Sequence, residues 1–279
     1  MNPVKKLLLL LLIFFTFPVF AISWQNNSEI EQIFKNAGVT GTFVLYDVSA
    51  NKMIGYNQKR AQTRFIPAST FKIPNSLIGL ETKAVKSVDE ILPYGGKPQS
   101  FKTWEKDMGL REAIKISNVP IYQELARRIT KTKMLAELKK LNYGNAQMGK
   151  DINQFWLDGS LKISAVEQTQ FLAKLANNAL PLSKSTQKAV QEITLLEQDS
   201  GWELHGKTGW SGRTKPGTGW WVGWVKKGNK IYSFAVNIDI HEEKELWIKT
   251  DFRARRHRQA HQSSPASPLN IDWKVYHDR

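Results

Sequence analysis

The sequence predicts an α+β fold, in which both ends of the chain build one antiparallel sheet and a mostly helical part is inserted between them. Three observations predict this fold. Strand-type runs lie near the start, GTFVLYDV and KMIGYN, and return from residue 202 onward. Apolar residues recur at helical intervals from about residue 67 to 200. Short links join the late strand-type runs, which makes those strands antiparallel neighbours.

The individual elements follow in chain order. SEIEQIFKNAG predicts a helix, because Ile30, Ile33 and Phe34 share one face and Gly38 suits its C-terminal end. GTFVLYDV and KMIGYN predict a hairpin joined by SANK, and IPASTFKIPNSLIGLETKA predicts a loop that enters a buried helix. Further helices are predicted from LREAIKIS, YQELARRITKTKMLAELKKLN, VEQTQFLAKLANNAL and SKSTQKAVQEITLLE. WELHGKTG, TGWWVGWVKKG and KIYSFAVNIDI predict three closing strands, so the sheet part covers about 22–66 and 201–246.

Residues 1–21 indicate a cleaved secretory signal peptide. Two lysines precede an apolar run, and Val19 and Ala21 form a small-residue cleavage pattern. The run before Pro18 is short for a spanning helix, which disfavours the alternative of a membrane anchor. We therefore expect a periplasmic protein with no membrane attachment after cleavage.

Composition excludes several classes of site. The chain has no cysteine, which excludes thiol catalysis and cysteine-ligated metals. Its five histidines lack H-E-x-x-H spacing, so no metal is expected. The net charge is +15, partly from RARRHRQAH in the tail. Without a zinc-finger, RNA-binding or helix-turn-helix pattern, we interpret this charge as a solvated basic surface and expect no nucleic-acid partner.

The tetrapeptide STFK carries the strongest chemical signal. Ser69 and Lys72 lie three residues apart on a predicted helix, which places both side chains on the same side. Small and apolar neighbours disfavour the charged form of the lysine, so it can act as a base for the serine. Ser69 would also sit at a helix N-terminus, where free N–H groups stabilise an oxyanion.

Three further short motifs follow. Ser117 in SNV is a second serine that can relay a proton, or simply a helix-ending serine. YGN, residues 143–145, follows another predicted helix and is by default its C-terminal cap. KTG, residues 207–209, lies on a strand, where Lys207 and Thr208 suit a carboxylate and Gly209 permits close approach of a ligand.

GWELHGKT, residues 201–208, also fits the P-loop pattern G-x-x-x-x-G-K-[ST]. A P-loop needs a helix directly after its Lys-Thr pair, whereas a Trp-rich strand follows here. Nucleotide binding is therefore the disfavoured interpretation of this stretch.

Together the motifs resemble those of the class D (oxacillinase-type) serine β-lactamases. The resemblance spans about Trp24 to Leu246, and it rests on PASTFKIPNSLIGLE, YGN, FWLDGSLKISAVEQ and KTGWSG…WWVGWV in that order. It implies a β-lactamase/transpeptidase-like fold, with the sheet flanked by terminal helices. It also implies a penicillin-binding catalytic domain over residues 22–246, either monomeric or homodimeric, with its helical part at about 67–200.

The resemblance also implies roles for individual residues. Ser69 matches the acylated nucleophile, and Lys72 matches a lysine that CO2 converts to an N-carboxylated base, with no other cofactor. Ser117 matches the proton relay. The remaining roles are the carbamate pocket (Phe71, Val119, Trp156, Leu157), the oxyanion hole (backbone N–H of Ser69 and Trp210), carboxylate binding (Lys207, Thr208, Gly209) and a structural motif (Tyr143, Gly144, Asn145).

The implied function is hydrolysis of β-lactam antibiotics through a Ser69 acyl-enzyme, which confers resistance. The alternative is a penicillin-binding sensor domain or transpeptidase, which acylates but deacylates slowly. Trp156 and the compact exported chain favour hydrolysis.

The basic tail, residues 247–279, departs from the family pattern. Lys249 lies near the position of the usual carboxylate-binding arginine, with Arg253 a distant second candidate. The tail lacks the apolar stripe of a terminal helix, which fits either a divergent end or a shifted reading frame. A sheet face without that helix predicts lower stability.

Overall fold

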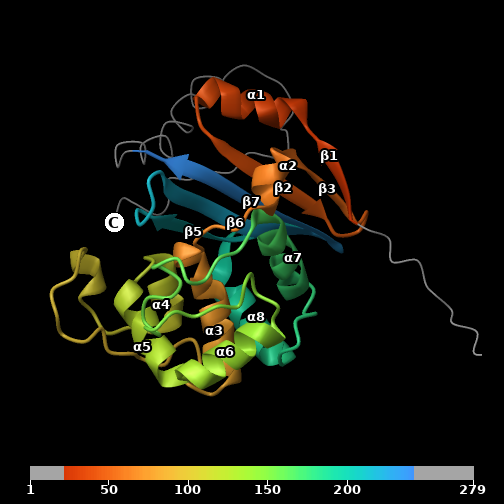
Figure 1. The fold of residues 1–279 in the computed structure, drawn as a ribbon. Coiled ribbons are helices and arrows are strands. Elements are labelled where there is room, and N and C mark those ends of the chain that lie inside the picture. The colour runs from red at the N-terminus through yellow and green to blue at the C-terminus, as the bar shows by residue number, and fades with distance from the viewer. Residues whose placement is uncertain (1–21, 242–279) are drawn as a thin grey trace, which may run out of the picture.

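The computed structural model describes residues 22–241, whose centre is a seven-stranded sheet in the order β1-β3-β2-β7-β6-β5-β4 (Figure 1). The strands are β1 (Ser23–Asn26), β2 (Gly41–Asp47), β3 (Lys52–Tyr56), β4 (Leu195–Asp199), β5 (Trp202–Ser211), β6 (Gly217–Lys227) and β7 (Lys230–Ile240). All neighbours are antiparallel except β1 and β3, which run parallel. The predicted α+β fold, with one sheet built from both ends of the chain, is confirmed, and the unpredicted β1 adds a parallel edge.

Helices cover both faces of this sheet. They are α1 (Ser28–Ala37), α2 (Gln58–Gln62), α3 (Lys72–Glu81), α4 (Leu110–Lys115), α5 (Val119–Ile129), α6 (Lys131–Lys140), α7 (Ala165–Ala176) and α8 (Lys184–Thr194), with 3-10 turns η1 (Ala68–Phe71) and η2 (Lys102–Trp104). Figure 1 shows α1 on one side of the sheet and α3 to α6 with α8 on the other. The predicted α1 is confirmed with its ends: the Asn27 side chain caps Ile30 N at 2.9 Å, and Gly38 ends the helix at a φ of +61°.

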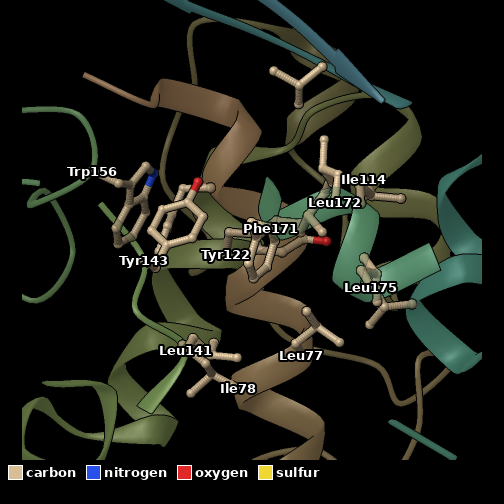
Figure 2. Packing of buried hydrophobic residues seen from close by; sticks show 14 of the residues in the cluster. Leu77, Ile78, Ile114, Tyr122, Leu141, Tyr143, Trp156, Phe171, Leu172 and Leu175 are labelled. Carbon is tan, nitrogen blue, oxygen red and sulfur yellow. The ribbon is translucent and has the colours of Figure 1, made fainter. Parts of the chain in front are cut away.

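The main core fills the space between α3 and the helices around it. Leu77 and Ile78 of α3 are fully buried, and Figure 2 shows them in the same cluster as Leu172 and Leu175 of α7. α7 also packs against β2, β6 and β7 of the sheet. The start of α3 is thereby fixed between the helical part and the sheet.

Two predicted helix boundaries are wrong. The helix predicted from SKSTQKAVQEITLLE ends at Thr194, and Leu195–Asp199 forms β4, because its backbone pairs with β5 at the open edge of the sheet. The long run YQELARRITKTKMLAELKKLN is two helices, because Thr130 has a φ of +72° and breaks the run between α5 and α6.

The predicted signal peptide, the last residues of the predicted domain and the basic tail, with Lys249 and Arg253, lie outside the described residues. Within residues 22–241, no helix has both the length and the hydrophobicity that a membrane span needs.

Candidate active site

Ser69 and Lys72 meet where the 3-10 turn η1 runs into α3. The side-chain nitrogen of Lys72, Nζ, lies 2.9 Å from Ser69 Oγ and donates a hydrogen bond to it. The Lys72 side chain is only 1% exposed. The spacing of STFK therefore places a buried amine against a hydroxyl, as a nucleophile and its base require.

The environment of Lys72 favours its neutral form. Burial lowers the pKa of Lys72 well below its usual value, and the positive charge of Lys207 lowers it further. A neutral amine can take a proton from Ser69, and it can also react with CO2, which an ammonium group cannot do. The pKa direction thus agrees with both roles that the sequence suggests.

The turn that presents Ser69 is held in a strained conformation. Ala68, directly before the nucleophile, has a φ of +49°, which is unfavourable for a residue with a Cβ. Its N–H donates to the carbonyl of Trp156 at 3.1 Å. Thr70 Oγ1 donates to Pro67 O at 2.7 Å and accepts from Gln168 Nε2 of α7 at 2.9 Å. These bonds hold the Ser69 backbone in one orientation.

Aromatic rings form one wall beside the lysine helix. Phe71 stacks on Trp156, with ring centroids 5.5 Å apart, and also contacts Tyr143 edge to face at 5.8 Å. Figure 2 shows Trp156 and Tyr143 at one end of the core cluster. Trp156 is 1% exposed, and its indole N–H makes no hydrogen bond to any residue from 22 to 241. A donor without a partner, on a side chain that is otherwise buried, is available to an oxygen that reaches it.

Ser117 lies between α4 and α5 with a φ of +57°. Its hydroxyl makes no hydrogen bond within the described part of the chain, so it is free to exchange a proton. The next residue, Asn118, is fully buried and caps α5 by accepting from Ile121 N at 3.1 Å. The N–H of Ser117 donates to Ile114 O at 3.3 Å, and the N–H of Asn118 donates to Ala113 O at 2.9 Å, so Ser117 also ends α4 as its left-handed cap residue.

The K-T-G triplet lies on the part of β5 that extends past β4. β4 pairs with β5 only from Trp202 to His205, so no described strand covers that side of β5 from Gly206 to Ser211. A substrate backbone can pair with such an edge. Lys207 is 7% exposed and donates to Thr208 O at 3.0 Å. The P-loop interpretation is wrong, because β5 continues through Lys207 and Thr208 without a helix.

Gly209 joins this edge to the nucleophile turn. A Cβ at Gly209 would lie 3.0 Å from Pro67 O and 3.1 Å from Thr70 N. Both positions belong to the segment that carries Ser69. The close approach brings the neighbouring Trp210 into the region of Ser69, where the sequence places the oxyanion hole.

The YGN segment is a structural joint. Gly144 has a φ of +55°, and it lies so close to Lys162 that an added Cβ would overlap the Lys162 carbonyl oxygen. Asn145 donates from Nδ2 to Ser160 O at 2.9 Å and accepts from Lys162 N at 3.0 Å. The default expectation that Gly-Asn caps a helix is wrong, because α6 ends at Lys140 with Leu141 as its cap, and these residues bind the segment after Leu157.

The structure joins several of the predicted site residues by direct contacts. Contacts join Ser69 to Lys72, Phe71 to Trp156 and Gly209 to the Ser69 turn. Leu157 is partly buried beside the core, and Val119 begins α5. Within residues 22–241, no three His, Asp or Glu side chains lie close enough to hold a metal ion.

Sequence reasoning missed the residues that hold these groups in place. Gln168 on α7 supports Thr70, and Tyr122 on α5 lies under Lys72, with the ring centroid 5.3 Å from Nζ. Gln168 is a buried polar residue in an otherwise apolar face, which is a weak signal available from the pattern. Nothing in the spacing of Tyr122 points to Lys72, which is fifty residues away.

Replacing Lys72 with methionine is expected to stabilise the fold near neutral pH. Since the folded-state pKa of Lys72 lies below its unfolded value of 10.5, the unfolded chain binds more protons between the two values. Burial of Lys72 therefore lowers the free energy of unfolding by its full amount at a pH below the folded-state pKa. This destabilisation disappears as the pH rises through 10.5. Urea unfolding without bicarbonate should show a gain of roughly 1–4 kcal/mol for Lys72→Met, shrinking at high pH.

Lys188→Met, on the exposed side of α8, is the control and should change the free energy of unfolding by less than about 0.5 kcal/mol. A Lys72→Met variant that is less stable than the wild type at every pH would contradict the prediction.

Comparison with known proteins gives a consistent result. The family model of the penicillin binding protein transpeptidase domain matches residues 41–251. Beta-lactamase OXA-5 of Pseudomonas aeruginosa is 44% identical over 240 residues, 85% of this chain and 90% of that protein. Beta-lactamase OXA-48 of Klebsiella pneumoniae is 38% identical over 232 residues, 83% and 88% of the two chains.

Solved structures agree with the sequence comparison. The crystal structure of FUS-1 (OXA-85), a class D β-lactamase from Fusobacterium nucleatum subsp. polymorphum, matches with a TM-score of 0.79 at 44% identity. The match covers 85% of this chain and 99% of that chain. A class D β-lactamase from Sebaldella termitidis matches with a TM-score of 0.78 at 36% identity, covering 85% and 96%.

Proposed function

Because the chain belongs to the penicillin-binding protein transpeptidase family and, within it, to the class D β-lactamases, we propose that Ser69 and Lys72 carry out its reaction. As a class D serine β-lactamase, the protein is a hydrolase that acts on β-lactams, and this activity confers antibiotic resistance. The observation that carries our proposal is the hydrogen bond of 2.9 Å between Ser69 Oγ and the buried Lys72, whose lowered pKa favours the neutral amine.

In the first step, Ser69 Oγ attacks the strained lactam carbonyl. The base at Lys72 takes the hydroxyl proton, and the backbone N–H groups of Ser69 and Trp210 stabilise the oxyanion. Ser117 returns the proton to the departing lactam nitrogen, and the C–N bond of the ring breaks. The product of this step is an acyl-enzyme on Ser69.

Lys207 and Thr208 bind the substrate carboxylate in this proposal. The uncovered edge of β5 from Gly206 to Ser211 aligns the amide part of the drug. Lys249, near the position of the usual arginine in the sequence, would add a second positive charge. The Lys207 charge then serves twice, since it attracts the carboxylate and also lowers the pKa of Lys72.

In the second step, water hydrolyses the ester on Ser69, with N-carboxylated Lys72 as the general base. In this proposal the carbamate lies beside the apolar ring pair of Phe71 and Trp156, and its expected donors are the indole N–H of Trp156 and the Ser117 hydroxyl, which have no hydrogen-bond partners among residues 22–241. When formed from CO2, the carbamate supplies a carboxylate-like base that a lone amine does not provide. No metal takes part in this scheme.

The proposal includes export. The N-terminal 21 residues have the pattern of a cleaved signal peptide, so we place the enzyme in the periplasm, where β-lactams meet their targets. It acts there as a monomer or homodimer.

The alternative is a penicillin-binding sensor or transpeptidase, which keeps its acyl group. It shares Ser69, Lys72 and the K-T-G strand but does not need a pocket prepared for a second base. The buried Trp156 donor without a partner favours the hydrolase.

Hydrolysis of a chromogenic cephalosporin tests the proposal. We expect multiple turnovers by the wild type, loss of turnover after decarboxylation at low pH, and recovery when bicarbonate is added at neutral pH. Ser69→Ala should form no covalent adduct in mass spectrometry. One equivalent of stable adduct on the wild type, without turnover at any bicarbonate concentration, would favour the sensor.

A further inference from the structure

We propose that Tyr122 is a positioning residue whose ring face orients the neutral amine of Lys72 toward CO2. The proposal rests on the carboxylation of Lys72 proposed above, and it adds a role for a residue outside the four sequence motifs. Tyr122 lies on α5, which begins two residues after Ser117.

Tyr122 is held against α3 at its hydroxyl and at its backbone carbonyl. Ser76 Oγ donates to Lys72 O at 2.8 Å, so its contact with Tyr122 OH at 2.9 Å uses the tyrosine proton. Asn75 Nδ2 donates to Tyr122 O at 3.2 Å. Both partners lie on α3, one turn beyond Lys72, and Tyr122 is fully buried. The ring therefore keeps its position relative to the lysine.

The position of the ring matters because of the shape of an amine. A neutral primary amine has two N–H bonds and one lone pair in a tetrahedral arrangement. One N–H of Lys72 donates to Ser69 Oγ at 2.9 Å. In our proposal the ring face, whose centroid lies 5.3 Å from Nζ, attracts the second N–H. The lone pair then points to the side that neither group covers and is available for CO2 before the lysine acts as a base.

Carboxylation at this nitrogen is balanced as follows. The Nζ lone pair forms a bond to the carbon of CO2 while one carbon–oxygen π bond opens. One N–H proton leaves to bicarbonate or buffer, and a carbamate anion remains on Lys72. Dissolved bicarbonate supplies the CO2. The amine that reacts fastest is one whose lone pair already faces the incoming carbon.

An aromatic face also attracts the charged ammonium form of lysine, and this attraction would oppose carboxylation. If the ring mainly held Lys72 in its charged form, removing the ring would make carboxylation easier. Burial and Lys207 already lower the pKa of Lys72, so the neutral amine dominates and orientation is the effect that remains. The bicarbonate requirement of a variant without the ring separates the two effects.

The test is a bicarbonate titration of decarboxylated enzyme at fixed pH, read by carbon-13 NMR of the Lys72 carbamate and by cephalosporin turnover. Tyr122→Leu should need about 2- to 5-fold more bicarbonate than the wild type for half-maximal carbamate signal, as expected for the loss of one weak N–H···π contact. Tyr122→Phe keeps the ring and should need close to the wild-type concentration. An equal or lower requirement for Tyr122→Leu would overturn the proposal.

A second pair of variants removes the packing change. Pentafluorophenylalanine at position 122 keeps the shape of phenylalanine but reverses the charge of the ring face. It should need more bicarbonate than Tyr122→Phe, and an equal need would overturn the proposal even if Tyr122→Leu does not fold. Phe34→Leu, on α1 across the sheet, controls for the loss of a buried aromatic ring.

The outcomes separate the two proposals. A wild type without a carbamate signal or bicarbonate dependence refutes the proposed base. A wild type with both, and variants equal to it, refutes the role of Tyr122 alone.

Discussion

Replacing Lys72 with alanine is expected to lower turnover of a chromogenic cephalosporin by about 10²- to 10⁴-fold, the usual contribution of a general base. Lys72 Nζ is the basic atom that contacts Ser69 Oγ, at 2.9 Å. Its loss removes the base for attack by Ser69 and also the base for attack by water on the ester. Deacylation should suffer more than acylation, because Ser69 retains its strained turn and its oxyanion donors.

Two measurements separate the steps. Stopped-flow kinetics should show a slow burst followed by almost no steady-state rate, and mass spectrometry should show Lys72→Ala trapped with the substrate mass on Ser69. Bicarbonate should not rescue the variant, whereas it rescues decarboxylated wild type. Lys188→Ala, an exposed lysine of α8, is the matched control and should keep the wild-type rate and its bicarbonate response. Wild-type deacylation by Lys72→Ala would exclude Lys72 as the base.

The fold was largely predictable because its signals are local. The helical periodicity of Ile30, Ile33 and Phe34, together with Gly38 at its end, predicted α1, whereas the Asn27 cap became visible only in the structure. Alternation and short links placed β2, β3, β5, β6 and β7. β4 was missed because LLEQD continues the helical run of α8, and only pairing with β5 makes it extended. The short edge strand β1 likewise depends on its partner β3.

Part of the candidate site was predictable from local sequence, and part was not. Ser69 and Lys72 were predictable because three residues along a helix fix their distance, and KTG was predictable as part of a strand. The supports were not, because they act across the tertiary structure. Tyr122 reaches Lys72 from α5, and Gln168 reaches the Ser69 turn from α7. A sequence pattern reports neighbours along the chain, and these contacts join helices that meet only after folding.

Two of the nine non-glycine residues with positive φ in the described part of the chain lie close to the chemistry. Ala68 and Ser117 both have positive φ, at +49° and +57°, and each neighbours or forms part of a motif. Lys72 adds an electrostatic penalty, since burial opposes its charge. The core around Leu77 and Leu172 offsets these penalties, which is why a chain without disulfides holds such a site. The strained and buried groups of the site thus lower the free energy of unfolding, and the packing of the core raises it.

Replacing Gly144 with alanine is expected to lower the free energy of unfolding by about 3 kcal/mol or more. Alanine at its φ of +55° is unfavourable by about 1–2 kcal/mol. The added methyl group would also overlap the backbone oxygen of Lys162 and approach Ile163 Cβ at 3.0 Å. Backbone atoms can move only a little, so residues 143–145 must separate from the segment around Lys162. Asn145 then loses its hydrogen bonds to Ser160 and Lys162.

Gly228→Ala isolates the steric part of this effect, because its φ of +56° matches that of Gly144 while nothing lies within 4 Å of the added methyl group. The control should therefore lose only about 1 kcal/mol. In thermal unfolding, Gly144→Ala should melt about 6–12 °C below the wild type, clearly lower than Gly228→Ala. Equal losses in the two variants would mean that the joint relaxes around the methyl group. A large loss at Gly144, with the acylation rate of the remaining folded protein unchanged, identifies YGN as a structural joint that holds the Trp156 wall and takes no part in the reaction itself.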